Sequence, residues 1–206
     1  MENFHIAETF KLLKNEKLNI FENFSLEEYR TARRRIIELI LHTDMEYHVS
    51  DLGILKNKVE SYEIKKGLNL NKLIEKENLI EVFENQQLIL GVALHSSDIS
   101  NVAKKTKICH KWRDLIFLEF FNQGDKEKSL NLKPSLMCDR ETTNVNSSQI
   151  YFISIIVKPY FDLLVNIFPE ISPLVDYIKI NLRNYQSICS KEEKEKETNE
   201  LTKNEK

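Results

Sequence analysis

The segment Ala93-Leu94-His95-Ser96-Ser97-Asp98-Ile99-Ser100-Asn101 closes a long apolar pattern that begins near Glu77. Apolar residues recur in that pattern at the spacing of one α-helix face, so the sequence predicts a helix from about residue 77 to Asp98. An aspartate that follows such a run often caps or ends the helix. Taken without its neighbours, Asp98 is therefore interpreted as a helix terminator.

Helical patterns continue in both directions from this segment. Ser25-Leu26-Glu27-Glu28 is a capping box, which opens a helix that we expect to reach about His48. Gln123-Gly124-Asp125 predicts a helix end, and Pro159 predicts a kink or an end in a very apolar helix. Helices are expected over 2–14, 25–48, 52–66, 77–98, 105–122, 148–167 and 172–189, with connections at 69–76 and 126–147. Only four glycines and four prolines are present, too few for a sheet-rich fold, so we predict one all-α domain over 1–190.

The last residues differ in composition from the rest of the chain. Residues 191–206 hold five lysines and six glutamates and almost no apolar side chain, so a disordered tail is predicted there. Over the whole chain, 30 basic and 32 acidic residues give a net charge of −2. The basic run Arg33-Arg34-Arg35 lies among acidic residues, so the charge pattern argues against a nucleic-acid partner.

The three cysteines, Cys109, Cys138 and Cys189, are isolated and odd in number. This pattern is typical of reduced thiols in the cytoplasm, and it predicts neither a disulfide framework nor a zinc cluster. No signal peptide opens the sequence, and the apolar stretch 150–167 is too short and too charged to span a bilayer. We therefore expect this segment to be soluble and cytoplasmic, without membrane contact.

Six segments, in one order and register, carry the strongest signal in the sequence. They are ENFHIA with FKLL (2–13), TDMEYH (43–48), ALHSSDISN (93–101), KW with EFFNQGD (111–125), MCDR (137–140) and SQIYFI (148–153). Together they resemble the class I 3′,5′-cyclic nucleotide phosphodiesterases, and the agreement extends from residue 2 to about 186. The resemblance implies a compact multi-helix bundle of the HD superfamily, incomplete at its N-terminus.

The resemblance also implies a chemistry. In the family, a hydroxide that bridges two divalent metal ions, zinc and magnesium or manganese, attacks phosphorus and opens the cyclic ester. The aspartate of the H-x-x-D-I-S-N segment is a metal ligand, and by this resemblance Asp98 becomes a ligand rather than a helix terminator. Most of the other metal ligands would lie outside this chain.

Gln149 and Phe152 are similar to the family's purine-binding pair. A side-chain amide can present its donor and its acceptor in either orientation, so it can bind adenine or guanine. Phe152 lies one helical turn further on the same face, behind the pair Ser147-Ser148, and matches the phenylalanine that stacks on the base. The alternatives are a solvent-facing glutamine in a first helical turn and an aromatic residue packed in the core.

Further positions match residues that line the family's substrate pocket, although Met and Ile at helical spacing are more often core residues. They are Met45, Asp98, Ile99, Asn101, Ile116 and Met137. Three histidines, His42, His48 and His95, are interpreted as structural residues or as supports of metal ligands, because the family's metal histidines lie elsewhere. Asp44 is expected near the metals, without an assigned role.

Two departures from the family pattern matter. The H-N-x-x-H and H-D-x-D-H segments, which supply the family's metal ligands and its proton donor, are not in this sequence. Val102 replaces the proline that usually follows Ser-Asn, a mild change. We therefore expect Met1 to be an internal methionine, as in a fragment, a truncated gene model or a short isoform, and the full-length protein could be membrane-anchored through the missing part.

Two functions follow. The first is hydrolysis of cyclic AMP or cyclic GMP to the 5′-monophosphate, with this chain supplying the nucleotide pocket and one metal ligand and being inactive alone. It would then require the missing N-terminal part of the catalytic domain as its partner. The second is a non-catalytic helical module that binds a nucleotide or a partner protein. The glutamine can serve either purine, so the sequence does not distinguish the two cyclic nucleotides.

Overall fold

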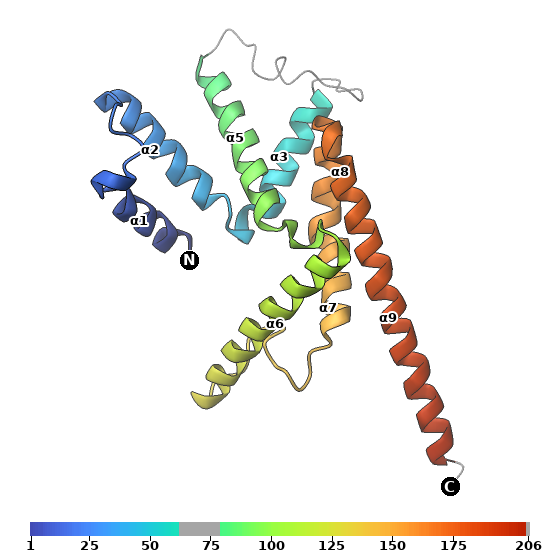
Figure 1. The fold of residues 1–206 in the computed structure, drawn as a ribbon. Helices are drawn as coiled ribbons and strands as arrows, with labels where there is room; N and C mark the ends of the chain where they lie inside the picture. The colour runs from blue at the N-terminus through green and yellow to red at the C-terminus, as the bar shows by residue number, and fades with distance from the viewer. Residues whose placement is uncertain (62–78, 205–206) are drawn as a thin grey trace. The chain divides into compact units, whose positions relative to one another are not determined.

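The structure is a computed structural model that describes residues 1–61 and 79–204 (Figure 1). Within these residues the fold is entirely helical and contains no strand, which confirms the all-α fold class. The chain divides into two compact units, Met1–Asp98 and Ile99–Lys206. The predicted connection at 69–76 and the end of the predicted helix 52–66 lie outside the described residues.

The first unit is a set of helices joined by short turns. Its elements are α1 (Glu2–Leu13), η1 (Glu16–Leu18), α2 (Leu26–Leu41), η2 (Met45–Tyr47), α3 (His48–Ser61) and α5 (Leu79–Asp98). The predicted capping box is confirmed, because the Ser25 side chain accepts from the Glu28 N–H and the Glu28 carboxylate accepts from the Ser25 N–H. The predicted helix 25–48 is wrong beyond Leu41: α2 ends there, and a turn and η2 precede α3.

Helix α2 packs closely against α5 in this unit. The Arg35 side chain donates to Gln86 Oε1 at 2.9 Å, and Gln87 Nε2 donates to the Arg35 carbonyl at 3.1 Å. Near the other end of the contact, Gly91 faces the ring of His42, and a Cβ at Gly91 would lie 3.2 Å from His42 Cγ. The absence of a side chain at Gly91 therefore allows α2 and α5 to approach each other.

The second unit is built on two long helices and one interrupted helix. Its elements are η3 (Ser100–Val102), α6 (Thr106–Ser129), α7 (Val145–Tyr151), the π-helix η4 (Phe152–Val157), α8 (Lys158–Ile167), η5 (Pro169–Ile171) and α9 (Ser172–Asn204). Its core is formed by buried residues of η3, α6, η4, α8 and α9. They are Ile99, Val102, Ala103, Cys109, Ile153, Val157, Phe161, Val175, Ile178 and Tyr185. The fully buried Asn181 of α9 fastens η3 to this core, because its Nδ2 donates to the carbonyls of Val102 and Lys104, each at 2.8 Å.

Helix α6 extends further than the sequence predicts. We expected a helix end at Gly124, but α6 continues to Ser129 and Gly124 lies buried within it. The backbone of Cys138 occupies the space that a side chain at position 124 would fill. Glycine at position 124 therefore allows two backbones to approach closely. Local sequence rules, which interpret a glycine as a helix end, do not predict this contact.

The apolar run Val145–Ile167 is longer than the stretch considered in the sequence. By length and composition alone it could cross a membrane, and no other helix in the described residues passes the same test. Here Ile153, Val157 and Phe161 of this run are buried in the core of the second unit, and Lys158 pairs with Asp162 along α8. The sequence predicted a kink or an end near Pro159, and the π-helix η4 interrupts the α-helical run there, ending two residues before the proline.

The charged C-terminal segment is helical, where the sequence predicted disorder. Helix α9 continues to Asn204, and only residues 205–206 of the predicted tail lie outside the described residues. Glutamate and lysine have high intrinsic helix propensity, and oppositely charged residues four apart support one another on a helix. Helix propensity and local ion pairs can thus stabilise a helix in a segment that buries little apolar surface.

Candidate functional site

Asp98 is the last residue of α5, and its side chain is exposed. One turn earlier, His95 is 1% exposed and its Nε2 lies 2.8 Å from Nδ1 of the buried His48 at the start of α3. One of the two rings donates to the lone pair of the other. Burial, reinforced by the neighbouring His48, lowers the pKa of His95, so a neutral pair is favoured. The two histidines thus join α3 to α5 beneath Asp98.

The remaining predicted residues of the first unit have structural contacts of their own. His42 Nδ1 donates to Asp51 Oδ2 at 2.6 Å, which links α2 to α3. Asp44 Oδ1 accepts from the Glu46 N–H and caps η2. Met45 follows in η2 and is 45% exposed. The structure gives the three histidines and Asp44 stabilising contacts, whereas the side chain of Met45 remains open to solvent.

In the second unit, Gln149 occupies an unusual environment. It lies on α7, is 4% exposed, and its Oε1 has no hydrogen-bond partner among the described residues. A buried polar atom without a partner costs free energy, and such atoms are rare in native structures. The alternative of a solvent-facing first-turn glutamine is therefore excluded. Gln149 therefore carries a buried acceptor that no described residue satisfies.

The helix start before Gln149 differs from the expected one. The N-cap of α7 is Asn144, whose Oδ1 accepts from the Ser147 N–H at 2.8 Å, and Ser147 and Ser148 lie inside the first turn. Phe152 begins η4, one turn after Gln149 as predicted, and packs partly buried against the core. Phe152 thus has a structural role whether or not it also stacks on a base.

The other predicted pocket residues of this unit differ in exposure. Ile99 is 7% exposed and belongs to the core, while Asn101 in η3 and Ile116 in α6 are half-buried. Met137 is half-buried in the loop between α6 and α7, and its φ of 66° is in the left-handed region. Few residues other than glycine adopt that region. The backbone at Met137 is held in a costly conformation.

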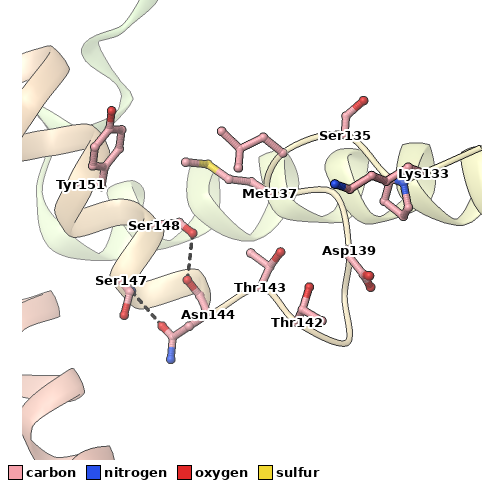
Figure 2. Close-up of a pocket in the computed structure, with 12 residues that line it drawn as sticks. Lys133, Ser135, Met137, Asp139, Thr142, Thr143, Asn144, Ser147, Ser148 and Tyr151 are labelled. Atoms are coloured by element: carbon pink, nitrogen blue, oxygen red, sulfur yellow. Dashed lines mark hydrogen bonds between the residues drawn. The ribbon is translucent and has the colours of Figure 1, made fainter.

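A cavity of about 880 Å³ lies between this loop and the start of α7 (Figure 2). It is lined by Lys133, Pro134, Ser135, Leu136, Met137, Asp139, Thr142, Thr143, Asn144, Ser147, Ser148 and Tyr151. Six of these residues carry a hydroxyl group, so the lining combines polar and apolar side chains. Of the substrate-binding residues that the sequence predicted, Met137 alone lines this cavity, and Gln149 and Phe152 lie on the helical run that forms its other wall.

The family model for 3′5′-cyclic nucleotide phosphodiesterase matches residues 1–178. The chain belongs to this phosphodiesterase family. The 3′,5′-cyclic-AMP phosphodiesterase 4C of Rattus norvegicus is 36% identical over 188 residues, which cover 91% of this chain and 34% of the relative. The 3′,5′-cyclic-AMP phosphodiesterase, isoform F, of Drosophila melanogaster is 34% identical over 189 residues, covering 91% of this chain and 27% of the relative. The chain thus spans about a third or less of these relatives.

Solved structures of phosphodiesterases share the fold. LmjPDEB1 in complex with IBMX superposes with a TM-score of 0.79 at 26% identity, over 92% of this chain and 52% of the solved chain. The phosphodiesterase domain of the RhoPDE fusion protein from the choanoflagellate Salpingoeca rosetta gives a TM-score of 0.78 at 28% identity, over 94% and 57%. Both matches cover little more than half of the solved chain.

Phosphodiesterases of this family are generally metal-dependent, and the described residues can be tested for a metal centre. No three His, Cys, Asp or Glu side chains of residues 1–61 and 79–204 lie together in a group that could hold an ion. Zinc requires about four ligands in a defined geometry. Asp98 contributes a single exposed carboxylate, so the described residues do not fit a complete metal centre.

One buried cluster of side chains in the second unit was not predicted from the sequence. Cys109 Sγ lies 3.4 Å from the hydroxyl of Tyr185, the Arg113 guanidinium lies over the Tyr185 ring, and the His110 ring lies beside it at a tilt of 43°. Burial raises the pKa of both Cys109 and Tyr185, so both stay protonated. Cys109 is therefore an unreactive core thiol. The contact joins residues 76 apart, a distance at which the sequence pattern carries no signal.

Proposed function

We propose that this chain forms the nucleotide-binding part of a catalytic domain that hydrolyses 3′,5′-cyclic nucleotides to 5′-monophosphates, with Gln149 as the residue that binds the purine. The observation that carries this proposal is the buried Oε1 of Gln149 without a partner. Family membership and the identity to cyclic-AMP phosphodiesterases support the reaction class.

The chemistry of the amide matches that of a purine edge. Adenine and guanine each present a donor and an acceptor side by side, in opposite orders, and an amide that can rotate pairs with either order. A bound purine would donate a hydrogen bond to the buried acceptor of Gln149. This bond would remove the free-energy cost of leaving that acceptor unpaired in the unliganded chain. Phe152, one turn away, offers a partly buried ring that could contact the face of the same base.

We further propose that Asp98 supplies one carboxylate to a two-metal centre of zinc with magnesium or manganese. The other ligands would come from the two histidine segments that this sequence does not contain. Asp98 is exposed at the end of α5, so its carboxylate is accessible. The chain alone would then bind nucleotide without hydrolysing it. All three cysteines are free, which supports a reducing compartment such as the cytoplasm.

Calorimetric titration of the purified chain with cyclic AMP, cyclic GMP and ribose 5-phosphate tests the proposal. We expect both cyclic nucleotides to bind, and ribose 5-phosphate, which has no base, to bind much more weakly. Hydrolysis is then measured for the chain and for a longer protein that carries both histidine segments. Equal binding of the sugar phosphate would contradict base recognition, and metal-dependent turnover by the chain alone would contradict the need for those segments.

A further inference from the structure

One turn of α6, Gly124–Lys128, holds the loop 130–144 along much of its length. The first contact is between backbones. Gly124 is buried, and an added Cβ would lie 1.9 Å from the carbonyl oxygen of Cys138 and 2.7 Å from its carbonyl carbon. Cys138 is itself 4% exposed. The middle of the loop is thus seated directly on the helix.

The second contact is an ion pair on the same turn. The Arg140 guanidinium donates from Nε to both carboxylate oxygens of Asp125, at 3.0 and 3.1 Å, and from Nη2 to Oδ2 at 2.5 Å. The guanidinium also lies 5.3 Å from the centre of the Phe121 ring. A paired and stacked arginine has a defined orientation, which an isolated surface ion pair lacks.

Two more residues of the turn bind the loop on either side of Met137. Glu127 accepts from the N–H and from the hydroxyl of Ser135, each at 2.6 Å. Lys128 donates to Asp139 at 2.8 Å and to Glu141 at 3.0 Å. We refer to Gly124, Asp125, Glu127 and Lys128 together as the α6 clamp.

Met137 lies between these fixed points. Helix α6 holds Ser135 on one side of Met137 in the sequence and Cys138 on the other. The φ of 66° at Met137 is consistent with a backbone constrained at both sides. A non-glycine residue keeps this conformation when its surroundings enforce it. Figure 2 shows the Met137 side chain extending from the loop towards the side of α7 that carries Ser148 and Tyr151, across the cavity that all three line.

We propose that the α6 clamp positions Met137 against the start of α7 and so fixes the wall of the nucleotide site next to Gln149. This inference rests on the proposed function, since it names positioning residues for that site. None of the clamp residues lines the cavity itself. The loop is accordingly a fixed wall, and loss of the clamp should loosen binding through Met137.

Methionine methyl NMR of the whole chain tests this directly. The sequence contains three methionines, so ¹³C-methyl labelling gives three resonances, and Met137→Leu assigns the one of interest. Asp125→Arg and Arg140→Asp each break the ion pair, and the double variant restores it with the charges exchanged. Glu127→Gln is a milder change in the same clamp. Asp176→Arg, at an exposed ion pair on α9, is the matched control.

We expect each clamp variant to shift or broaden the Met137 methyl resonance and to raise the dissociation constant of cyclic AMP roughly two- to ten-fold, the lower part of the range for coupled partners in one network. The exchanged pair should recover both, and the control should change neither. An unaltered Met137 resonance in all clamp variants would overturn the proposal that the α6 clamp positions Met137. A shifted resonance with unaltered affinity would overturn its role in binding.

The two proposals can fail separately. If the unaltered chain binds no nucleotide, the proposed function is overturned and the positioning role with it. The methyl resonances are measured without ligand, so they would still decide whether the clamp holds Met137. If Asp125→Arg fails to fold, Glu127→Gln and the exchanged pair give the same comparison.

Discussion

Gly124 and Cys138 are packed so closely that the carbonyl oxygen of Cys138 lies 1.9 Å from the position of a Cβ on residue 124. Real Cβ atoms essentially never approach another heavy atom below 3.0 Å, and here the neighbour is backbone rather than a flexible side chain. This contact ties the loop to α6 more strictly than any of the surrounding ion pairs, because a backbone cannot move aside without moving the loop.

Gly124→Ala should therefore destabilise the chain, by about 1–3 kcal/mol or more, as overpacking of a close contact does. The measurement is urea-induced unfolding followed by circular dichroism. Gly53→Ala is the control, since nothing lies within 4 Å of a Cβ at that helical position. It should stabilise by roughly 0.5–1 kcal/mol. Equal effects of the two changes would show that the Gly124 contact is not tight in solution.

Gln149→Ala should weaken nucleotide binding while leaving the free energy of unfolding little changed. The alanine removes a buried acceptor that has no partner in the unliganded chain, which offsets the packing that is lost. Gln186→Ala, at an exposed position of α9, is the control. Calorimetric titration and urea unfolding are measured on both variants. Unchanged affinity in folded Gln149→Ala protein would refute the assignment of the base site to α7.

Phe152→Ala should affect both binding and stability, because the ring packs against the core of the second unit. Removing a fully buried phenylalanine costs about 3–5 kcal/mol, so we expect less for this half-buried one. Loss of base stacking would weaken binding by roughly 1–3 kcal/mol. Ile155→Ala, 56% exposed in the same π-helix, should change neither. A loss of stability with unchanged affinity would make Phe152 a core residue only.

Asp98→Ala is predicted to abolish hydrolysis in a longer protein that contains both histidine segments. Changes outside the first ligand sphere already cost roughly 10–100-fold in affinity or activity, so loss of a ligand should remove most of the bound metal. Metal content by mass spectrometry, turnover and circular dichroism are compared with those of Asp114→Ala, an exposed aspartate of α6. Turnover within a few-fold of the unaltered protein would make Asp98 a helix terminator only.

The His48–His95 pair should make stability dependent on pH. The pKa of His95 is lowered from 6.5, first by burial and then by His48, with Asp98 and Asp51 opposing the shift. Below about pH 6.5 the unfolded chain therefore binds a proton that the folded chain does not, and stability falls as pH decreases. Urea unfolding between pH 7.5 and 5.5 measures this slope.

His95→Gln should flatten that pH dependence, although it also lowers stability at neutral pH because the contact with His48 is lost. His5→Gln changes an exposed histidine of α1 and is the matched control. If the slope of the His95→Gln variant equals that of the unaltered chain, the titrating group lies elsewhere.

Local sequence signals predicted much of this structure. The capping box at Ser25 and the apolar period before Asp98 each depend on a few neighbouring residues, and the structure contains both features. The motif order identified the family and directed attention to Gln149. Its burial, and the lack of a partner for its acceptor, could not be predicted, because both depend on residues distant along the chain.

Features set by long-range contact were missed for the same reason. Gly124 is a helix-ending residue by local rules, and only the approach of Cys138 explains why it lies inside α6. The helix end at Leu41 instead of His48 was missed because the residues before and after the intervening turn both form helices, so the sequence pattern does not mark the break. The cavity beside Met137 is formed by a loop whose path is fixed by the α6 clamp, which the sequence pattern does not encode locally.

The π-helix η4 shifts the helical phase between α7 and α8. The Lys158 N–H donates to the carbonyl of Ile153, five residues back, so the run contains one residue more than an α-helix of the same height. One residue corresponds to about 100° of rotation. If the same residues were wound as an uninterrupted α-helix, Gln149 would be turned by about that angle relative to α8. The π-helical winding of this short segment thus sets the direction in which the Gln149 amide faces.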